Sequence, residues 1–253
     1  MNEFSLTSTK QVVFIADAHL GLPGDDPSRA KRLESFLGSL SEKTSHLYIL
    51  GDLFDFWFEY RTVVPNTAPG VLCALHQLVC SGVRVICLAG NHDYWSGAYL
   101  REGIGMKLHP DDLTVEHQGI RIYLHHGDGL YPDDHGYRLL KKILRNRAII
   151  SMFRLIHPDL AARIARITSS TSRKYLAPPP GRDETYANLF RTIADARLSG
   201  GYDAAVYGHS HVALAEKRNN GTLVLLGDWI ARSTYAVLER GEFTLHEWSN
   251  GER

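Results

Sequence analysis

Side chains that can bind metal ions follow five separate apolar runs of this sequence. Asp17 and His19 come after the first run, and His209 and His211 come after the last. Residues two positions apart in extended chain point to the same side, so each pair could face one ion. Carboxylates, imidazoles and amides together suit Mn²⁺, Zn²⁺ or Fe²⁺. The side chains at the five run ends are Asp17, His19, Asp52, Asp55, Asn91, His92, Asp93, His125, His126, Asp128, His209 and His211.

None of these five run ends is decisive by itself. Asp-x-His is common, and Gly-Asp or Gly-Asn-His-Asp can be an ordinary turn, because Gly, Asn and Asp favour turns. Gly-His-x-His is moderately specific. Five such ends in one chain are hard to explain as independent turns, and ligands of open α/β sheets gather beyond the carboxyl ends of strands. The set therefore predicts one site, in which two metals ~3.5–4 Å apart would form a clamp for attack at phosphorus.

The elements that would position these residues alternate between strand and helix patterns. Short apolar runs predict strands, and apolar residues at helical spacing predict helices. The alternation favours an α/β fold of two packed mixed β-sheets flanked by helices. Helices are predicted over 28–42 and 68–82, and strands are predicted over 11–17, 46–52, 83–90 and 202–209, with strand pairs in 113–128, 212–228 and 234–248.

Residues 134–182 differ from the rest of the chain, which we otherwise treat as a single domain over 1–253. Their eleven basic and two acidic residues give a formal charge of +9, and the apolar residues recur at helical spacing. Pro158 is predicted to start a further helix. Two interpretations stay open: a solvated helical face packed on the domain, or a helical lid over an anionic ligand with apolar groups.

Composition excludes several function classes. The formal net charge is +0, from 28 basic and 28 acidic residues, so no nucleic-acid partner is expected. Residues 1–10 lack the apolar core of a signal peptide, and no run of about 18 apolar residues occurs. Cys73 and Cys80 share a face of a predicted helix, where core packing is favoured. We therefore expect a cytoplasmic protein.

The order of the motifs resembles the calcineurin-like metallophosphoesterase superfamily. It runs Asp-x-His, Gly-Asp-x-x-Asp, Gly-Asn-His-Asp, His-Gly-Asp and Gly-His-x-His, from residue 17 to residue 211. The resemblance implies two divalent metals bridged by Asp52, with His92 as general acid or ligand of a phosphate oxygen and Asp93 orienting it. One metal would take Asp17, His19, Asp52 and His211, and the other would take Asp52, Asn91, His126 and His209.

Four further residues lie in or near these motifs: His125, Asp55, Asp128 and Asp228. His126, rather than His125, is the expected ligand because it directly precedes Gly-Asp, and neighbouring strand residues face opposite sides. Asp55 and Asp128 are expected to fix ligands from behind. Asp228 repeats the Gly-Asp pattern in "LLGDW" and is expected to lie outside the site.

Within the superfamily, the sequence looks most like the UDP-2,3-diacylglucosamine diphosphatases of the lipid A pathway. The resemblance rests on "YILGDLFDFW" (48–57), "HGDGLYPDDHGY" (126–137) and the insertion before Gly-His-x-His. It implies Mn²⁺ and hydrolysis of a nucleotide-linked acylated sugar to UMP and 2,3-diacylglucosamine 1-phosphate. It also implies substrate contacts from Asp134 and Tyr137, acyl chains under a lid, and peripheral contact with the inner face of the inner membrane. The best-known members carry arginine at the position of His92.

Two rival functions are also compatible with the sequence. One is a metallophosphoesterase for a soluble nucleotide, phosphodiester, nucleic acid or phosphoprotein, which activity on a soluble diester comparable to that on the lipid substrate would favour. The other is a binding module that has kept the fold and lost the chemistry. A complete set of ligands argues against the second, and metal content would decide it.

Overall fold

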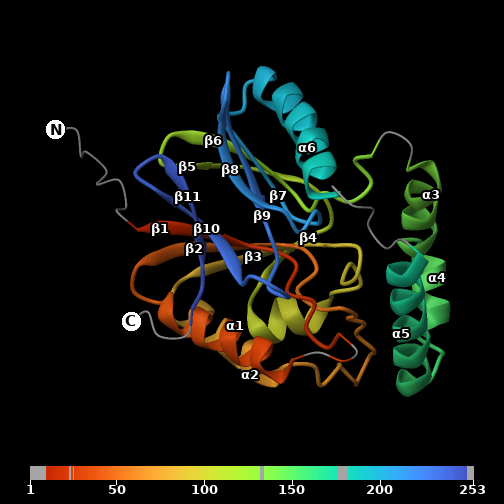
Figure 1. Cartoon of the computed structure of the whole chain (residues 1–253). Coiled ribbons are helices and arrows are strands. Elements are labelled where there is room, and N and C mark those ends of the chain that lie inside the picture. Colours follow the sequence, from red (N-terminus) through yellow and green to blue (C-terminus); the bar gives the residue numbers. More distant parts are fainter. Residues whose placement is uncertain (1–9, 23, 25, 132–133, 176–181, 250–253) are drawn as a thin grey trace.

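Two β-sheets lie face to face, and helices cover their outer faces (Figure 1). The computed structural model describes residues 10–22, 24, 26–131, 134–175 and 182–249. The predicted architecture of two packed mixed sheets flanked by helices is confirmed.

The first sheet has six strands in the order β11-β10-β1-β2-β3-β4. Strands β1 to β4 are parallel neighbours, and β10 and β11 run antiparallel on the other edge. The parallel strands therefore end on the same side, as the prediction of a shared site requires. The strands are β1 Gln11–Ile15, β2 Thr44–Leu50, β3 Arg84–Leu88, β4 Lys107–His109, β10 Thr234–Glu239 and β11 Glu242–Glu247.

The second sheet has five strands in the order β5-β6-β7-β9-β8. Strands β6, β7 and β9 are parallel, and the edge strands β5 and β8 pair antiparallel with β6 and β9. The three predicted strand pairs are present, and turns at Gln118-Gly119, Asn220-Gly221 and Arg240-Gly241 connect them. The strands are β5 Leu113–His117, β6 Ile120–His125, β7 Ala204–Tyr207, β8 Ala213–Arg218 and β9 Gly221–Leu226.

Central strands bury side chains on both faces, which explains their continuous apolar runs. In β1, Val12 and Phe14 belong to the core between the sheets, whereas Val13 and Ile15 pack toward the helices. Successive residues alternate between faces, so one strand joins two cores. The C-terminal ends of these strands, where the polar residues follow, are thereby fixed by packing on both sides.

Four helical segments pack close to the two sheets. The Asp26 side chain accepts a hydrogen bond from the backbone N–H of Ser28 and caps α1, as is usual at helix starts. The sequence does not predict α6, whose narrow apolar stripe includes Phe190, Ala194 and Leu198 against the second sheet. The segments are α1 Pro27–Ser39, α2 Pro69–Cys80, the π-helix η1 Tyr99–Ile104 and α6 Arg182–Ser199.

The expectation that Cys73 and Cys80 pack in the core is wrong. Both are exposed, and only Cys87, in β3, is buried. Helix α2 buries a different stripe, formed by Val71, Leu75 and their neighbours. The two cysteines do share a face of the helix, but it is the face turned away from the sheet.

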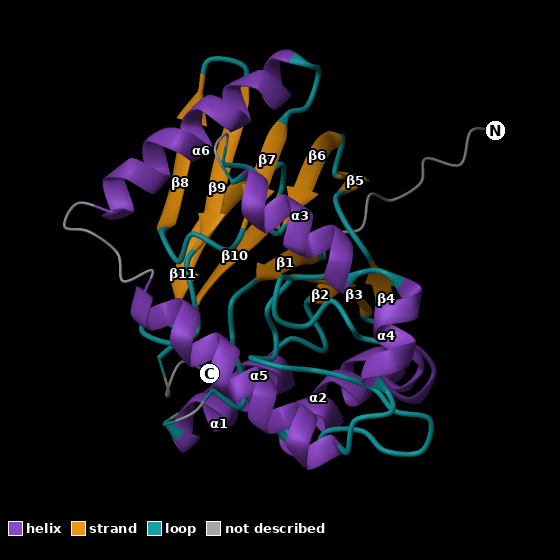
Figure 2. Ribbon diagram, turned by 90° about the vertical axis from the view of Figure 1, so that its right-hand side faces the viewer, coloured by secondary structure: helices purple, strands orange, loops and turns teal. Residues whose placement is uncertain are grey.

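Three helices from the basic segment, α3 His135–Leu144, α4 Arg147–Phe153 and α5 Pro158–Tyr175, lie together at one end of the sheets (Figures 1 and 2). Pro158 is the first residue of α5, as predicted. In the described part of the chain, no helix has the length and apolar character that crossing a membrane requires.

Candidate metal centre

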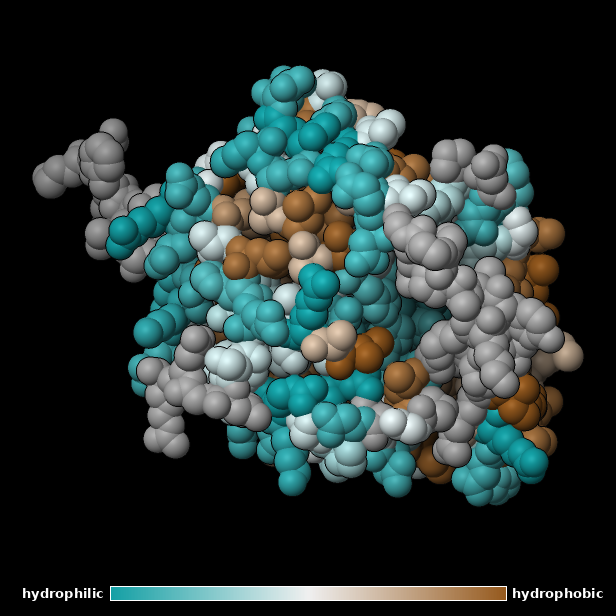
Figure 3. All heavy atoms as spheres, viewed as in Figure 1, coloured by the Kyte–Doolittle hydropathy of each residue, from teal (hydrophilic) through white to brown (hydrophobic). Residues whose placement is uncertain are grey.

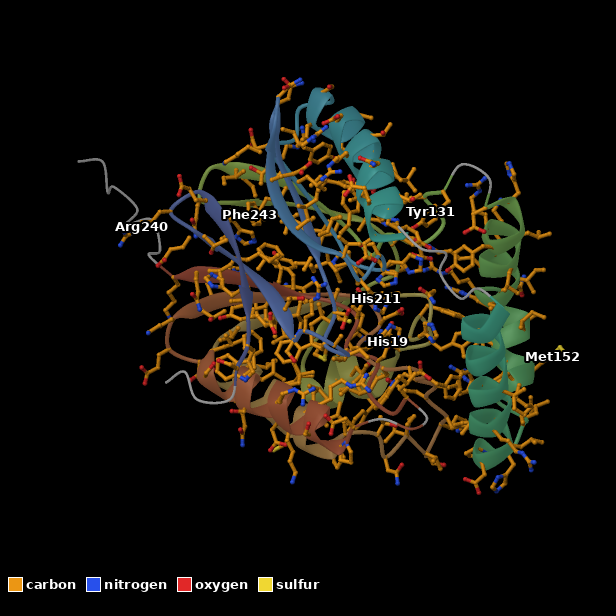
Figure 4. All side chains as sticks on the ribbon, viewed as in Figure 1. His19, Tyr131, Met152, His211, Arg240 and Phe243 are labelled. Atoms are coloured by element: carbon orange, nitrogen blue, oxygen red, sulfur yellow. The ribbon has the colours of Figure 1, made fainter. Side chains whose placement is uncertain are left out.

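The polar strand ends meet at the edge of the sheets that faces α3 to α5. His19 and His211 lie close together there (Figure 4), and their rings stack at 5.4 Å between centroids. Three groups of side chains could each hold a metal ion: Asp17, His19 and His211; Asp52, His126 and His209; and His19, Asp55 and His92. The structure therefore brings together residues that are up to 194 positions apart in the sequence.

The first group is centred on the buried carboxylate of Asp17. Its Oδ1 atom lies 3.7 Å from His19 Nε2 and 3.7 Å from His211 Nε2. Its Oδ2 atom accepts a hydrogen bond from the backbone N–H of His209 at 2.7 Å. One carboxylate oxygen thus holds the Gly-His-x-His turn, and the other faces two imidazoles.

The second group is centred on Asp52. Its Oδ2 atom lies 3.4 Å from His126 Nε2, and that nitrogen lies 3.0 Å from Asn91 Oδ1. The Nδ1–H of His126 donates to the Leu50 carbonyl at 2.6 Å, so Nε2 is the nitrogen that carries the lone pair once the ring is neutral. Asp52 Oδ2 also lies 3.6 Å from His19 Nε2. Asp52 therefore stands between the two groups, where a bridging ligand would have to be.

An unusual backbone conformation aims these side chains inward. Positive φ is uncommon outside glycine, yet Asp17, His19, Asp52, His209 and His211 all adopt it, with φ between 44° and 63°. Such left-handed residues cluster at functional sites, where surrounding contacts compensate their strain.

Two glycines permit the close approach of these turns. A Cβ atom on Gly51 would lie 2.6 Å from His126 Nδ1, and a Cβ on Gly90 would overlap the Asp52 carboxylate. Any side chain at either position would have to displace a candidate ligand. The sequence pattern Gly-Asp and Gly-Asn therefore has a steric cause beyond turn preference.

The chemistry of these groups fits divalent cations. Asp17 Oδ1 and both ring nitrogens of His19 are buried without a hydrogen bond, although buried polar atoms nearly always have a partner. Burial would raise the pKa of Asp17 and Asp52, but nearby histidines lower both values. The carboxylates are therefore ionised, and they stand opposite imidazoles at ordinary ligand positions.

His92 lies at the rim of this centre. Its backbone N–H donates to Asp52 Oδ1 at 2.9 Å, and its ring Nδ1–H donates to the Asp55 carbonyl at 2.9 Å. The Asp55 carboxylate lies 3.6 Å from both His92 Nδ1 and His19 Nδ1. Asp55 therefore orients two imidazoles, which fits its expected supporting role, and it leaves His92 Nε2 for another partner.

The expectation that Asp93 orients His92 is wrong. The buried Asp93 carboxylate accepts hydrogen bonds from the backbone N–H groups of Leu53 at 2.8 Å and Gly90 at 3.0 Å, and from those of Asp52 and Phe54. It ties the turn after β2 to the turn after β3. Asp93 thus supports the backbone that carries Asp52 and Asn91.

The expectation that Asp228 lies outside the site is also wrong. Its Oδ2 atom lies 3.6 Å from His211 Nδ1, so it faces the ring nitrogen opposite the one near Asp17. Strands β7 and β9 are parallel neighbours, so the residues that follow them in sequence meet. A carboxylate behind a ligand imidazole fixes its ring orientation and tautomer.

Asp128 connects the centre to α3 instead of contacting a ligand. Its buried carboxylate lies 2.8 Å from Lys141 Nζ and accepts a hydrogen bond from the Tyr137 hydroxyl at 2.5 Å. Lys141 and Tyr137 both belong to the basic segment, so this segment is anchored at the strand end that carries His126. His125 has its Nδ1 atom 2.7 Å from the backbone N of Gly127 and accepts its hydrogen bond.

A cavity of about 390 Å³ separates the metal centre from α3 to α5. His92, Asn91 and Asp55 line one wall, and Tyr137, Lys141 and Arg145 contribute polar groups from α3 and the residue after it. The rest of the lining is mostly apolar. Asp134, at the start of α3, is not among the lining residues, whereas Tyr137 is. The apolar residues are Phe56, Trp95, Leu140, Leu144, Phe153, Ile164 and Ala165.

We expect metal affinity to rise with pH and binding to release protons. Burial alone would lower the pKa of His19 and His126, but neighbouring carboxylates raise both to about 10. Because ligation needs neutral imidazole, ions must displace these protons below that pH. Calorimetric titration with Mn²⁺ between about pH 6.5 and about pH 9, in buffers of different ionisation enthalpy, measures both effects. A pH-independent affinity without proton release would contradict the assignment of these imidazoles as ligands.

Comparison with known proteins gives consistent matches. A family model described as calcineurin-like phosphoesterase matches residues 10–213. A protein of Porphyromonas gingivalis named UDP-2,3-diacylglucosamine hydrolase is 29% identical, over 96% of this chain and 99% of that protein. A protein of the same name from Stenotrophomonas maltophilia is 31% identical, over 92% of this chain and 96% of that protein.

Among solved structures, Yfce, a phosphoesterase from E. coli, is 17% identical with a TM-score of 0.44, over 95% of this chain and 100% of that chain. The family model spans most of the chain and every candidate ligand from Asp17 to His211. The chain belongs to the calcineurin-like phosphoesterases, which are metal-dependent hydrolases.

Proposed function

We propose that this chain hydrolyses the diphosphate of UDP-2,3-diacylglucosamine, giving UMP and 2,3-diacylglucosamine 1-phosphate. The observation that carries the proposal is the cavity, which joins the metal centre to an apolar wall. A purely polar nucleotide would leave that wall without a partner, whereas acyl chains would fill it. The names of the two relatives support the same substrate.

In this proposal the two side-chain groups hold two divalent ions, with Asp52 between them. Asp17, His19 and His211 would bind the first ion, and Asn91, His126 and His209 would bind the second. Mn²⁺ is our choice of metal, although Zn²⁺ or Fe²⁺ also accepts such ligands. When bound, the ions supply Lewis-acid stabilisation of charged phosphoryl oxygens and lower the pKa of water.

His92 would act on the phosphate beside the ligands. Its Nδ1–H is fixed by the Asp55 carbonyl, so the proton that moves is the one on Nε2. From the cavity wall, Nε2 would donate a hydrogen bond or a proton to a phosphate oxygen as charge develops there. Asp93 would contribute by holding the two turns, without touching the substrate.

The helices α3 to α5 would serve as a lid, as an insertion over 134–182 within one domain. Tyr137, whose hydroxyl donates to Asp128, would contact the polar part of the substrate together with Asp134. Burial and the Asp128 charge raise the pKa of Tyr137 well above its usual value, so its hydroxyl stays a donor. Leu140, Leu144 and Phe153 would cover acyl chains, each buried methylene adding ~0.8 kcal/mol.

The direct test is UMP release from UDP-2,3-diacylglucosamine. We expect turnover with Mn²⁺ and none after chelation, because the ions would stabilise the negative charge on the phosphoryl oxygens. The His92→Ala variant should keep its metal content and lose about 10²–10⁴-fold in turnover, the usual range for a positioned acid or base. Chromatographic quantification of UMP and elemental analysis of each variant measure these outcomes.

Three results would contradict parts of this proposal. Absence of UMP release from metal-loaded wild-type protein would remove the substrate assignment. Equal turnover of UDP-2,3-diacylglucosamine and a soluble phosphodiester would favour a phosphoesterase for soluble substrates. Near-normal turnover of His92→Ala would show that His92 has only a structural role in its turn and takes no part in the reaction.

The lid is tested with two neighbouring leucines on α3. Leu140 lines the cavity, whereas Leu139 is also exposed and does not line it. We expect Leu140→Asp to reduce hydrolysis of the diacylated substrate by about tenfold or more, because a charge beside acyl chains is costly. Hydrolysis of a small chromogenic phosphodiester should stay unchanged, and Leu139→Asp should retain both activities. Equal loss on both substrates in Leu140→Asp would make the residue structural.

We also propose that α3 to α5 contact an anionic bilayer, at the inner face of the inner membrane in the cytoplasm. Hydrophobic side chains are visible on that side of the molecule in Figure 3. These helices also carry the exposed basic residues Lys142 and Arg147, and the exposed Arg154 directly follows α4. This combination of apolar and basic residues suits a bilayer surface. The exposed apolar residues of these helices, and of the turn between α4 and α5, are Leu139, Leu140, Ile143, Met152, Leu155, Leu160, Ile164 and Ile167.

Cosedimentation with vesicles containing anionic lipid tests this contact. The double variant Met152→Asp/Leu155→Asp should bind at least about tenfold more weakly, since two exposed apolar side chains lose their burial in the bilayer. The matched control, Val63→Asp/Ile230→Asp, changes two exposed apolar residues outside these helices and should bind like wild type. Equal binding of all three proteins would rule out this surface.

A further inference from the structure

A buried arginine stands directly behind the turn that carries Asp17 and His19. Arg29 lies in the first turns of α1, and only 2% of its surface is exposed. Its Nη1 atom donates to the Ala18 carbonyl at 3.0 Å and to the His19 carbonyl at 3.3 Å. Arginine is seldom buried unless its charge and donors are used, so this placement calls for a physical reason.

The turn that Arg29 holds is conformationally costly. Asp17 and His19 both have positive φ, at 55° and 44°. Other backbone contacts restrain the same turn: Asp17 N–H donates to Gly51 O at 3.2 Å, and His19 N–H donates to Asp52 O at 2.9 Å. Those bonds run to the neighbouring strand end. Arg29 adds a restraint from α1, on the opposite side of the sheet from the second sheet.

The electrostatic surroundings of Arg29 include the carboxylates behind the first ligand group. Burial and the charge of Arg32 lower the pKa of Arg29, whereas the charges of Asp228 and Asp55 act in the opposite direction. Asp55 is the partner of His19 Nδ1, and Asp228 is the partner of His211 Nδ1. Arg29 thus binds the backbone of one ligand, His19, and its charge acts at a distance on the two carboxylates that lie beside His19 and His211.

We infer that Arg29 is a positioning residue for the first metal group, Asp17, His19 and His211; this rests on the proposed metal centre. Arg29 holds the Ala18 and His19 carbonyls so that the Asp17 carboxylate and the His19 ring face one shared ion. The second group, Asp52, His126 and His209, contains no residue whose backbone Arg29 binds. The effect of Arg29 is therefore confined mainly to one of the two ions.

Two opposite effects are expected from removing this residue, and they can be separated. Loss of the hydrogen bonds would release the turn and weaken metal binding. Loss of a nearby positive charge would reduce repulsion and strengthen it. We infer that positioning outweighs repulsion, because partners behind metal ligands typically change affinity by about 10–100-fold.

The test measures Mn²⁺ binding to the full chain and three variants by electron paramagnetic resonance and calorimetry. Arg29→Met removes both the donors and the charge, whereas Arg29→Lys keeps the charge. The control is Arg32→Met on the same helix, whose guanidinium binds Asp26 at 3.1 Å and not the metal-site turn. Spin coupling between two Mn²⁺ ions distinguishes a filled pair from a single ion.

We expect wild type and Arg32→Met to bind two coupled ions. Arg29→Met should lose about 10–100-fold in affinity for one ion, so that at limiting Mn²⁺ its spectrum becomes that of a single uncoupled ion. The affinity of Arg29→Lys for this ion should lie between those of wild type and Arg29→Met. Lysine can donate to one carbonyl but lacks the planar fork of arginine. If Arg29→Met does not fold, as judged by circular dichroism, Arg29→Lys alone decides the question by its loss of affinity for one ion.

Three results would overturn the inference. Two ions bound by Arg29→Met with unchanged or higher affinity would show that positioning does not dominate. Equally weaker binding of both ions by Arg29→Met would show that Arg29 supports the fold in general and not one metal group. A wild-type chain that binds no Mn²⁺ would overturn the proposed metal centre together with this inference, whereas the first two results leave the proposed function intact.

Discussion

The buried negative charge of Asp52 is the constraint on which the rest of the site depends. Its carboxylate lies 3.4 Å from His126 Nε2 and 3.6 Å from His19 Nε2, away from water. An isolated charge in such a place is strongly unfavourable. The fold therefore has to bring cationic or cation-binding groups to Asp52 from several strands at once, and the parallel ends of β1, β2, β3, β6 and β7 do so.

Delivering these groups requires sharp turns, and the structure supports each turn from outside the ligand layer. Asp93 holds the turns after β2 and β3 through four backbone N–H groups. Arg29 holds the turn after β1 through two carbonyls. Left-handed residues persist where surrounding contacts fix them. The candidate ligands and the residues behind them thus form two layers with different tasks.

The cavity next to this polar centre explains why the basic segment is also apolar. Asp128 is joined to Lys141 and Tyr137 of α3, and the Trp95 indole N–H donates to the Leu144 carbonyl at 3.0 Å. These contacts hold the helices against the metal centre while Leu140 and Phe153 face the cavity. The basic segment therefore contains both a charged residue, Lys141, that binds Asp128, and apolar residues that line the cavity.

The sequence by itself determined the two-sheet fold and the seven candidate ligands, because each ligand directly follows a strand whose apolar run is visible locally. It could not determine which carboxylate supports which histidine. Asp228 meets His211 only because β9 lies beside β7, and β8 comes between them in the sequence. The Asp93 carboxylate accepts hydrogen bonds from backbone N–H groups instead of orienting its neighbour His92. Arg29, from α1, donates hydrogen bonds to the turn after β1. These contacts depend on strand order and helix packing, which local residue patterns do not encode.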